Sequence, residues 1–421
     1  MKFKAIHILL LFSSFVAAVL SLSVLNGNTM YILLIHLLQQ PASSEGSIAV
    51  LAAAAQSQPS NNSNMTSSLS TSSSSSVSSL PDVFQKVENS VVQITSTKSN
   101  PNEVIILNGV PQTGRRSTAL GSGFVYDDQG HIVTNYHVID GASRADVTFT
   151  DGNTYSANVV GKDPNSDVVI LQITSNFSEE KVVPLPLANS SAVRPGEQVI
   201  AIGNPFGLSG TITTGIVSAK GRLLPNPDTG FSIPNMIQTD TAINPGNSGG
   251  PLLNTKGEAI GMNTAIFSRT GSYSGVGFAI PSNTIAKEVP LLIKNGSYAH
   301  PWLGISGGKI TPDSIRAMGL PANYKGVIVG SIQPGSPAEK SGLKGLTQDD
   351  NNNNNNNGGG DAAPQTGDVI TAVDGHPTRQ IDDIINYIES QKNIGDNIKL
   401  TVNRNGQIMD LTAALQARPN T

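Results

Sequence analysis

Short apolar runs dominate the chain from Leu80 to about Asn295, and Gly, Pro, Asn or Asp separates them roughly every dozen residues. This pattern is typical of antiparallel barrels or sandwiches, in which turns join short strands. A helical pattern over 283–294 closes the segment. The clearest strand candidates are residues 91–94, 145–149, 168–173, 198–202 and 277–280. We therefore predict a mainly β domain over residues 81–297.

A smaller α+β domain is predicted to follow over residues 298–417. Its amphipathic helix carries four isoleucines that share one apolar face at helical spacing: Ile381, Ile384, Ile385 and Ile388. Its strand candidates are residues 326–329, 368–373 and 397–402. An insert at 347–366, with seven consecutive Asn followed by three Gly, interrupts this domain. Such a low-complexity tract favours a solvated surface loop.

The first 80 residues carry a different pattern. Lys2 and Lys4 precede a long, mostly apolar run, which is typical of a signal peptide or a membrane anchor over residues 1–40. The sequence does not decide between these two. Residues 41–80 are rich in Ser and bury too little apolar surface to offset their chain entropy, so we predict a disordered linker.

Composition narrows the classes of function. The 421 residues carry 26 Lys and Arg against 30 Asp and Glu, a net charge of −4, whereas a nucleic-acid-binding protein would show a basic stripe. We therefore expect no nucleic-acid partner. Cys is absent from the sequence, which excludes disulfides, cysteine nucleophiles and cysteine metal sites.

The string from Asn244 to Pro251 is the most informative motif. Its serine, Ser248, is flanked by glycines, which let a backbone pass close to a substrate carbonyl. The same turn can direct successive N–H groups at one point, as an oxyanion hole requires. Gly246 and Ser248 are the predicted donors, with Asn247 as a further candidate. An ordinary β-turn without catalytic function is the alternative.

A serine nucleophile needs a general base, and His137 is the best candidate. It follows an apolar run, whereas His131 lies in a predicted hairpin turn. His300 and His376 belong to the second domain. A purely structural histidine is the alternative interpretation of His137.

Asp167 is the predicted partner of that base, because it immediately precedes an apolar strand and can be buried there. Asp163 is its rival, but Pro164 beside it indicates an exposed turn. Asp151 is a weaker candidate, since Asp-Gly-Asn is a ready hairpin turn. The resulting chain order, His137, Asp167 and Ser248, is that of the chymotrypsin-type triad.

At this point the chain resembles the HtrA/Deg family of serine proteases. The matching strings are residues 121–124, 134–139, 166–168, 203–207, 214–218, 238–240, 246–250 and 277–281. The resemblance implies a chymotrypsin-like double β-barrel, formed by two perpendicular six-stranded barrels with the triad in the cleft between them. It also implies that no metal or cofactor is needed.

The same resemblance implies a specificity pocket. In chymotrypsin-like folds the residue six before the nucleophile lies at the base of this pocket, and here that residue is Ala242. Ile266 resembles the residue of the pocket wall in the family, although an ordinary core role stays open. An uncharged, shallow pocket would favour small or medium aliphatic side chains over Lys or Arg.

The second domain resembles a PDZ domain. Residues 302–305, Trp302, Leu303, Gly304 and Ile305, match the loop in which backbone N–H groups hold the terminal carboxylate of a peptide. The peptide would add as a strand beside the helix that bears Ile384, Ile385 and Ile388. Further matches are residues 326–329, 335–343 and 367–370. A small domain without a ligand is the alternative.

The resemblance as a whole implies an ATP-independent serine endopeptidase of the cell envelope that degrades unfolded or misfolded proteins. Its PDZ-like domain would bind C-terminal or apolar peptides and regulate the protease. One such domain behind an N-terminal apolar segment resembles the membrane-tethered branch, which usually forms homotrimers; Phe84 is a candidate trimer contact or core residue. The location is expected to be extracytoplasmic, membrane-anchored or secreted. The alternatives are a regulatory protease with one membrane substrate and a non-proteolytic peptide-binding chaperone.

Overall fold

A computed structural model describes residues 79–107, 110–139, 141–174, 182–204, 210–264, 275–346 and 367–419. The predicted signal or anchor segment, all but the end of the Ser-rich linker, Ile266 and the Asn-rich insert lie outside the described residues. Within the described ranges, none of the helices is long and apolar enough to cross a membrane.

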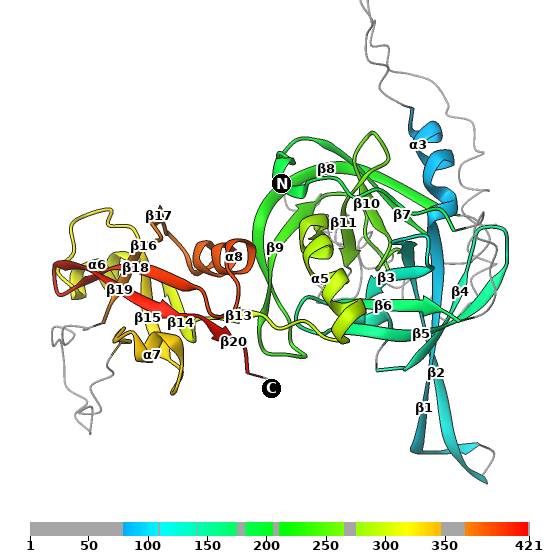
Figure 1. The fold of residues 1–421 in the computed structure, drawn as a ribbon, viewed down its shortest axis with the longest axis horizontal. Coiled ribbons are helices and arrows are strands. Elements are labelled where there is room, and N and C mark those ends of the chain that lie inside the picture. Colours follow the sequence, from blue (N-terminus) through cyan, green and yellow to red (C-terminus); the bar gives the residue numbers. More distant parts are fainter. Residues whose placement is uncertain are drawn as a thin grey trace, which may run out of the picture. The chain divides into compact units, whose positions relative to one another are not determined.

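Twelve strands form two closed barrels of six strands each (Figure 1). The first barrel has the order β1-β2-β3-β6-β5-β4. Its strands are β1 (Val91–Leu107), β2 (Val110–Val125), β3 (His131–Asn135), β4 (Arg144–Thr148), β5 (Thr154–Asp163) and β6 (Val168–Ile173). In a closed barrel, residues that face the interior alternate with residues that face outward along each strand, and in a barrel of this size the inward side chains fill the interior.

The second barrel has the order β10-β11-β12-β9-β8-β7. Its strands are β7 (Gln198–Gly203), β8 (Thr211–Pro225), β9 (Ser232–Thr239), β10 (Pro251–Leu253), β11 (Ala259–Thr264) and β12 (Gly277–Pro281). One apolar cluster includes Phe124 of β2, Ile200 of β7 and Met236 of β9. The two barrels therefore share a continuous core.

Short helices cover and connect the barrels: α3 (Leu80–Val87), η2 (Glu88–Ser90), α4 (Tyr136–Ile139), η4 (Ser190–Ala192) and α5 (Ser282–Asn295). The predicted helix over 283–294 corresponds to α5. Its Ile285, Val289 and Leu292 enter the shared core. The α5 backbone also touches β5 directly, because a Cβ at Gly161 would lie 2.4 Å from the Leu292 carbonyl oxygen.

The remaining residues form a small α+β domain. A sheet with the order β14-β15-β16-β18-β19 carries the short β17 beside β16, and β13 pairs separately with β20. The strands are β13 (Pro301–Trp302), β14 (Ile305–Lys309), β15 (Val327–Ile332), β16 (Val369–Val373), β17 (His376–Pro377), β18 (Asn397–Arg404), β19 (Gln407–Ala414) and β20 (Gln416–Ala417). The helices are α6 (Pro312–Ala317), α7 (Pro337–Lys340) and α8 (Ile381–Gln391).

The predicted fold class, mainly β with a double barrel and a small α+β domain, is confirmed. The apolar face of α8 is also as expected, since Ile384 and Ile388 are buried in the core of the second domain. The prediction for His131 was wrong. It begins β3 rather than lying in the turn, and its buried ring bonds Asp127 at 2.6 Å, which closes the preceding turn.

Candidate active site

A tight turn over residues 244–250 presents Ser248. The Asn247 N–H donates to the Asn244 carbonyl at 3.1 Å, and the Gly250 N–H donates to the Asn247 carbonyl at 3.1 Å. The Asn247 side chain locks the same turn, since its Oδ1 accepts from the Asn244 N–H and its Nδ2 donates to the Ala242 carbonyl. The Asn247 N–H is thus already engaged, which leaves those of Gly246 and Ser248 as the candidate oxyanion donors.

The turn of Ser248 is fastened to the first barrel. The Ser122 N–H donates to the Ser248 carbonyl at 2.8 Å, and the Ser122 hydroxyl donates to the Gly246 carbonyl. Gly249, with φ of +83°, leaves no room for a side chain: a Cβ there would lie 2.3 Å from Thr134 Oγ1. Strand β3, which ends two residues before His137, therefore runs directly against the turn of the serine.

His137 lies on α4 and pairs with Asp167. Its ring Nδ1 is 2.9 Å from Asp167 Oδ2 and 3.1 Å from Oδ1, and its backbone N–H donates to Oδ1 at 3.0 Å. An ionised carboxylate only accepts, so Nδ1 carries the proton and Nε2 has a free lone pair. Burial lowers the pKa of His137, but the hydrogen bond and charge of Asp167, with the charge of Asp228, raise it above its ordinary value.

The Asp167 carboxylate is buried while the His137 side chain is 35% exposed, so the imidazole faces solvent on its other side. Asp167 has a backbone φ of +56°, a left-handed conformation that costs about 1–2 kcal/mol for a residue with a side chain. Its carbonyl accepts from the Tyr136 N–H at 3.1 Å and from Asn135 Nδ2 at 3.2 Å. These bonds hold the strained residue beside the histidine.

Thr264 of β11 is a site residue that the sequence did not reveal. Its hydroxyl donates to Asp167 Oδ2 at 3.0 Å from the second barrel. It therefore orients the carboxylate towards His137. A threonine in an apolar strand gives no sequence signal for such a role, because its partner lies 97 residues away.

Ser248 is buried, and its turn lies against β3. Among the described residues, no hydrogen bond joins the Ser248 hydroxyl to the His137 ring. Such catalytic hydrogen bonds are often long without substrate and shorten when substrate binds. The three predicted residues are thus carried by segments that bond one another directly.

The expectation that Asp163 lies in an exposed turn was wrong. Asp163 is 2% exposed, and its Oδ2 lies 2.7 Å from Nε2 of His300. Pro164 does form a turn, but His300, which lies 137 residues later in the chain, packs against the Asp163 side chain. Asp151 does lie in an exposed hairpin turn, where it accepts from the Asn153 N–H at 2.9 Å.

Ala242, the predicted base of the specificity pocket, is bonded to the turn of Ser248. Ala242 is half-buried, and its carbonyl accepts from the Asn247 side chain and from Thr213 Oγ1 at 3.1 Å. Its position is thereby tied to the turn of Ser248. Ile266 lies outside the described residues, so its role stays a prediction.

The second domain contains a groove beside the predicted carboxylate-binding loop. A cavity of about 110 Å³ is lined by residues 301–305, by Ile384, Ile385 and Ile388 of α8, and by Phe231, Ser232, Glu389 and Arg418. The loop carbonyls of Leu303 and Gly304 accept from the N–H groups of Ala338 and Gln333. No cis peptide occurs among the described residues, so the N–H groups of Gly304 and Ile305 point away from Ala338 and Gln333, opposite to the carbonyls of the same peptide units. Strand β14 is at the edge of its sheet and can accept another strand.

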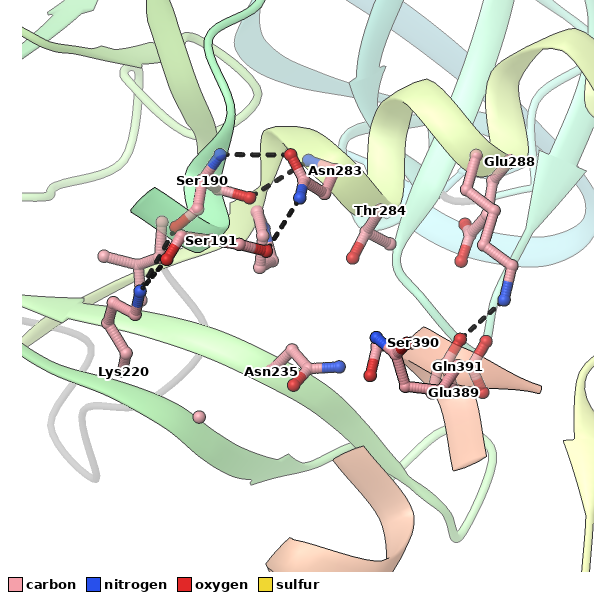
Figure 2. Close-up of a pocket in the computed structure, with 14 residues that line it drawn as sticks. Ser190, Ser191, Lys220, Asn235, Asn283, Thr284, Glu288, Glu389, Ser390 and Gln391 are labelled. Carbon is pink, nitrogen blue, oxygen red and sulfur yellow. Dashed lines mark hydrogen bonds between the residues drawn. The ribbon is translucent and has the colours of Figure 1, made fainter. Parts of the chain in front are cut away.

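A larger cavity of about 380 Å³ lies elsewhere (Figure 2). It is lined by α5, which contributes Glu288, by β8 and β9, and by the end of α8, which contributes Glu389. Neither His137, Asp167 nor Ser248 lines it. This cavity is therefore separate from the triad, although its size is greater than that of the groove.

One buried group within the described ranges has the spacing of a metal site: Asp163, Glu288 and His300 place ligand atoms within 4.8 Å of one another. Both ring nitrogens of His300 nevertheless face carboxylates, Asp163 at 2.7 Å and Glu389 at 2.9 Å. A ring that donates from both nitrogens offers no lone pair to a metal. The group is better described as part of a hydrogen-bonded network in which His300 bridges the carboxylates of Asp163 and Glu389.

Comparison with known proteins agrees with this geometry. Residues 121–262 match the family model of the trypsin-like peptidase domain, and residues 301–415 match that of the PDZ domain. Among solved structures, the HtrA-type protease AlgW with a decapeptide is 31% identical with a TM-score of 0.61, covering 82% of this chain and 100% of that chain. The serine endoprotease from Yersinia pestis is 28% identical with a TM-score of 0.54, covering 81% and 99%.

Curated relatives are also named as proteases. Protease Do-like 1 of Arabidopsis thaliana, a chloroplastic protein, is 40% identical over 340 residues, which cover 80% of this chain and 72% of the relative. Periplasmic serine endoprotease DegP of Salmonella typhimurium is 38% identical, and the match covers 71% of this chain but 57% of that relative. The chain thus spans little more than half the length of such bacterial relatives. With its double barrel, its PDZ domain and these identities, the chain belongs to the HtrA/Deg family of serine proteases.

Proposed function

We propose that the protein is an ATP-independent serine endopeptidase in which Ser248, His137 and Asp167 form the catalytic triad. The observation that carries this proposal is the pairing of His137 Nδ1 with the buried Asp167 carboxylate. That pairing sets the tautomer in which Nε2 accepts a proton. The turn of Ser248 is bonded to Ser122 of β2, a strand of the barrel that carries His137 and Asp167.

In the proposed mechanism, Ser248 Oγ attacks the scissile carbonyl carbon while His137 Nε2 takes the hydroxyl proton. The N–H groups of Gly246 and Ser248 then stabilise the negative oxygen of the tetrahedral intermediate. His137 gives its proton to the leaving amine, and water completes hydrolysis of the acyl-enzyme by the same steps. Asp167 stabilises the imidazolium throughout, since its carboxylate stays on Nδ1.

We further propose that the protein acts outside the cytoplasm on unfolded or misfolded chains. Support comes from relatives whose names describe periplasmic or chloroplastic proteases. Residues 1–40 would supply the signal or anchor. Phe84 is half-buried, with ring atoms about 3 Å from the Cβ position of Gly210, and the proposed homotrimer could use this region. A regulatory protease with one substrate and a peptide-binding chaperone are the alternatives.

The PDZ domain is proposed to bind C-terminal peptides. The N–H groups of Gly304 and Ile305 would hold the terminal carboxylate, and the apolar α8 side chains would receive the last side chain. A solved HtrA-type relative is described with a decapeptide, which supports a peptide as the ligand class. Binding there would regulate proteolysis.

Replacing Ser248 with Ala is expected to lower casein cleavage by about 10⁴-fold or more, because no other group can form the acyl-enzyme. Labelling by a fluorophosphonate probe should disappear with it, and mapping the labelled peptide of the wild type should return Ser248. Circular dichroism and the thermal midpoint serve as controls for folding. Undiminished cleavage by the folded variant would refute the proposed mechanism.

Cleavage-site profiling of the wild type should return small or medium aliphatic residues, such as Val, Ala or Ile, before the scissile bond. Ala242 carries no charge to pair with a basic side chain, so discrimination must come from shape and apolar contact. Replacing Ala242 with Asp should shift the profile towards Lys and Arg. A wild-type profile dominated by Lys or Arg would contradict this pocket.

A fluorescent decapeptide ending in an apolar residue is expected to bind the Ser248→Ala protein, and its C-terminal amide should bind about 10- to 100-fold more weakly. The difference reflects the loss of charge-assisted hydrogen bonds to the backbone loop. Fluorescence anisotropy measures both affinities. Equal binding of acid and amide would mean that the loop at Gly304 does not hold a terminal carboxylate.

A further inference from the structure

The catalytic Asp167 ends a five-residue turn that begins at Asp163. The turn carries one strained residue, Asp167 itself, with φ of +56°. Within the turn, Asp163 Oδ1 accepts from the Asn165 N–H at 2.9 Å. From a distant segment, Asn226 Nδ2 donates to the Pro164 carbonyl at 2.8 Å. Strain of this kind persists only where surrounding contacts over-determine the conformation. The side chains that bond the turn from other segments therefore help to set the position of Asp167.

Glu288 of α5 bonds the turn at Ser166, the residue before Asp167. Ser166 is fully buried, and its hydroxyl donates to Glu288 Oε1 at 2.9 Å. Glu288 is 1% exposed, and burial, followed by the charge of Asp163, raises its pKa well above the ordinary value, although the charge of His300 opposes this. The neutral acid is thus the favoured form, and it can still accept from Ser166.

His300 bonds the other end of the turn, at Asp163. Its Nε2 donates to Asp163 Oδ2 at 2.7 Å, and its Nδ1 donates to Glu389 Oε1 of α8 at 2.9 Å. Donation from both nitrogens requires the imidazolium. Burial lowers the pKa of His300, but the hydrogen bonds and charges of Asp163 and Glu389 together raise it to about 10.

Two carboxylates face two cations at the centre of this buried network. The carboxylates of Asp163 and Glu389 face two cations, His300 and Arg418, whose guanidinium Nη2 is 3.9 Å from Glu389 Oε2. Other ionisable side chains pack around them: Tyr298, whose ring contacts that of His300, and Lys287, whose Nζ donates to the Glu389 carbonyl. Figure 2 shows Glu288 and Glu389 bordering one cavity from different helices.

We propose that Glu288 and His300 are positioning residues for the catalytic Asp167, acting through Ser166 and Asp163. Glu288 holds the turn as a neutral hydrogen-bond acceptor, and His300 holds it as a cation shared with α8 of the PDZ domain. Neither touches the substrate. This inference rests on the proposed role of Asp167 in the triad.

The first test compares Glu288→Leu, Glu288→Gln and Ser166→Ala by steady-state kinetics on a fluorogenic peptide taken from cleavage profiling. Glu288→Leu and Ser166→Ala should lower kcat by about 10- to 100-fold with little change in KM, since a small displacement of a catalytic group has that effect. Glu288→Gln should keep kcat close to that of the wild type, because its amide oxygen is also a neutral acceptor. The acidic limb of kcat/KM should move to lower pH in Glu288→Leu, because a displaced Asp167 raises the pKa of His137 less.

Glu258→Leu is the matched control. Glu258 is a half-buried glutamate of the second barrel that bonds Asn254, away from the triad, and its loss should leave kcat and the acidic limb unchanged. Urea denaturation monitors folding, and some loss of stability is expected in Glu288→Leu because the buried Ser166 hydroxyl loses its partner. Ser166→Ala, which removes that hydroxyl, keeps the test decisive if Glu288→Leu does not fold. Wild-type kcat in Glu288→Leu, or equal losses in Glu288→Leu and Glu288→Gln, would overturn the proposal. The proposed function would still stand if Ser248→Ala remained inactive.

The second test uses the titration of His300. Its pKa is raised from 6.5 in the unfolded chain to about 10, so its contribution is complete below pH 6.5 and is lost as the pH rises through about 10. The wild type should therefore lose kcat and urea resistance towards pH 10. His300→Arg, which keeps a multi-donor cation at that pH, should retain both to higher pH. Identical alkaline limbs for the two folded proteins would overturn the assignment of His300.

Discussion

The proposed catalytic arrangement depends on one buried carboxylate, that of Asp167, paired with an imidazole that stays open to solvent. Two hydrogen bonds from His137 and one from Thr264 orient it. The backbone there is left-handed, a conformation that most residues avoid. Neighbouring contacts offset the energetic cost of this conformation, and many of them converge on the turn between Asp163 and Asp167.

The barrels, the helix α5 and the PDZ domain all contribute to that constraint. The second barrel supplies Thr264 and the turn of Ser248, whereas the first supplies His137 and Asp167. Glycine is required where these parts meet, since Gly249 and Gly161 allow backbones to approach within a distance that any Cβ would block. A buried charge that loses its partner is strongly destabilising. The network around His300 therefore fixes the position of the turn and also makes stability depend on the protonated form of His300.

Much of this molecule follows from local patterns in the sequence. Alternating and continuous apolar runs indicated the strands, because a side-chain period of two is a property of the strand itself. The helical spacing of Ile384 and Ile388 likewise marked the buried face of α8. The glycine-flanked Ser248, and an aspartate placed before an apolar strand, pointed to the triad and to its order along the chain. Each of these signals is carried by residues that are neighbours in the chain.

Contacts between distant residues were beyond those patterns. Asp163 seemed exposed because its own neighbourhood contains Pro164, and only the folded chain brings His300 over it, 137 residues later. Thr264 and Glu288 carry no local mark of their bonds to Asp167 and Ser166, 97 and 122 residues away. The sequence by itself determined the strands, the two domains and the identities of candidate catalytic residues, since these depend on short-range periodicity and on residue chemistry. Only the tertiary structure decided which buried charges meet and how the catalytic turn is held, because burial and electrostatic partners are set by packing between segments that the sequence keeps apart.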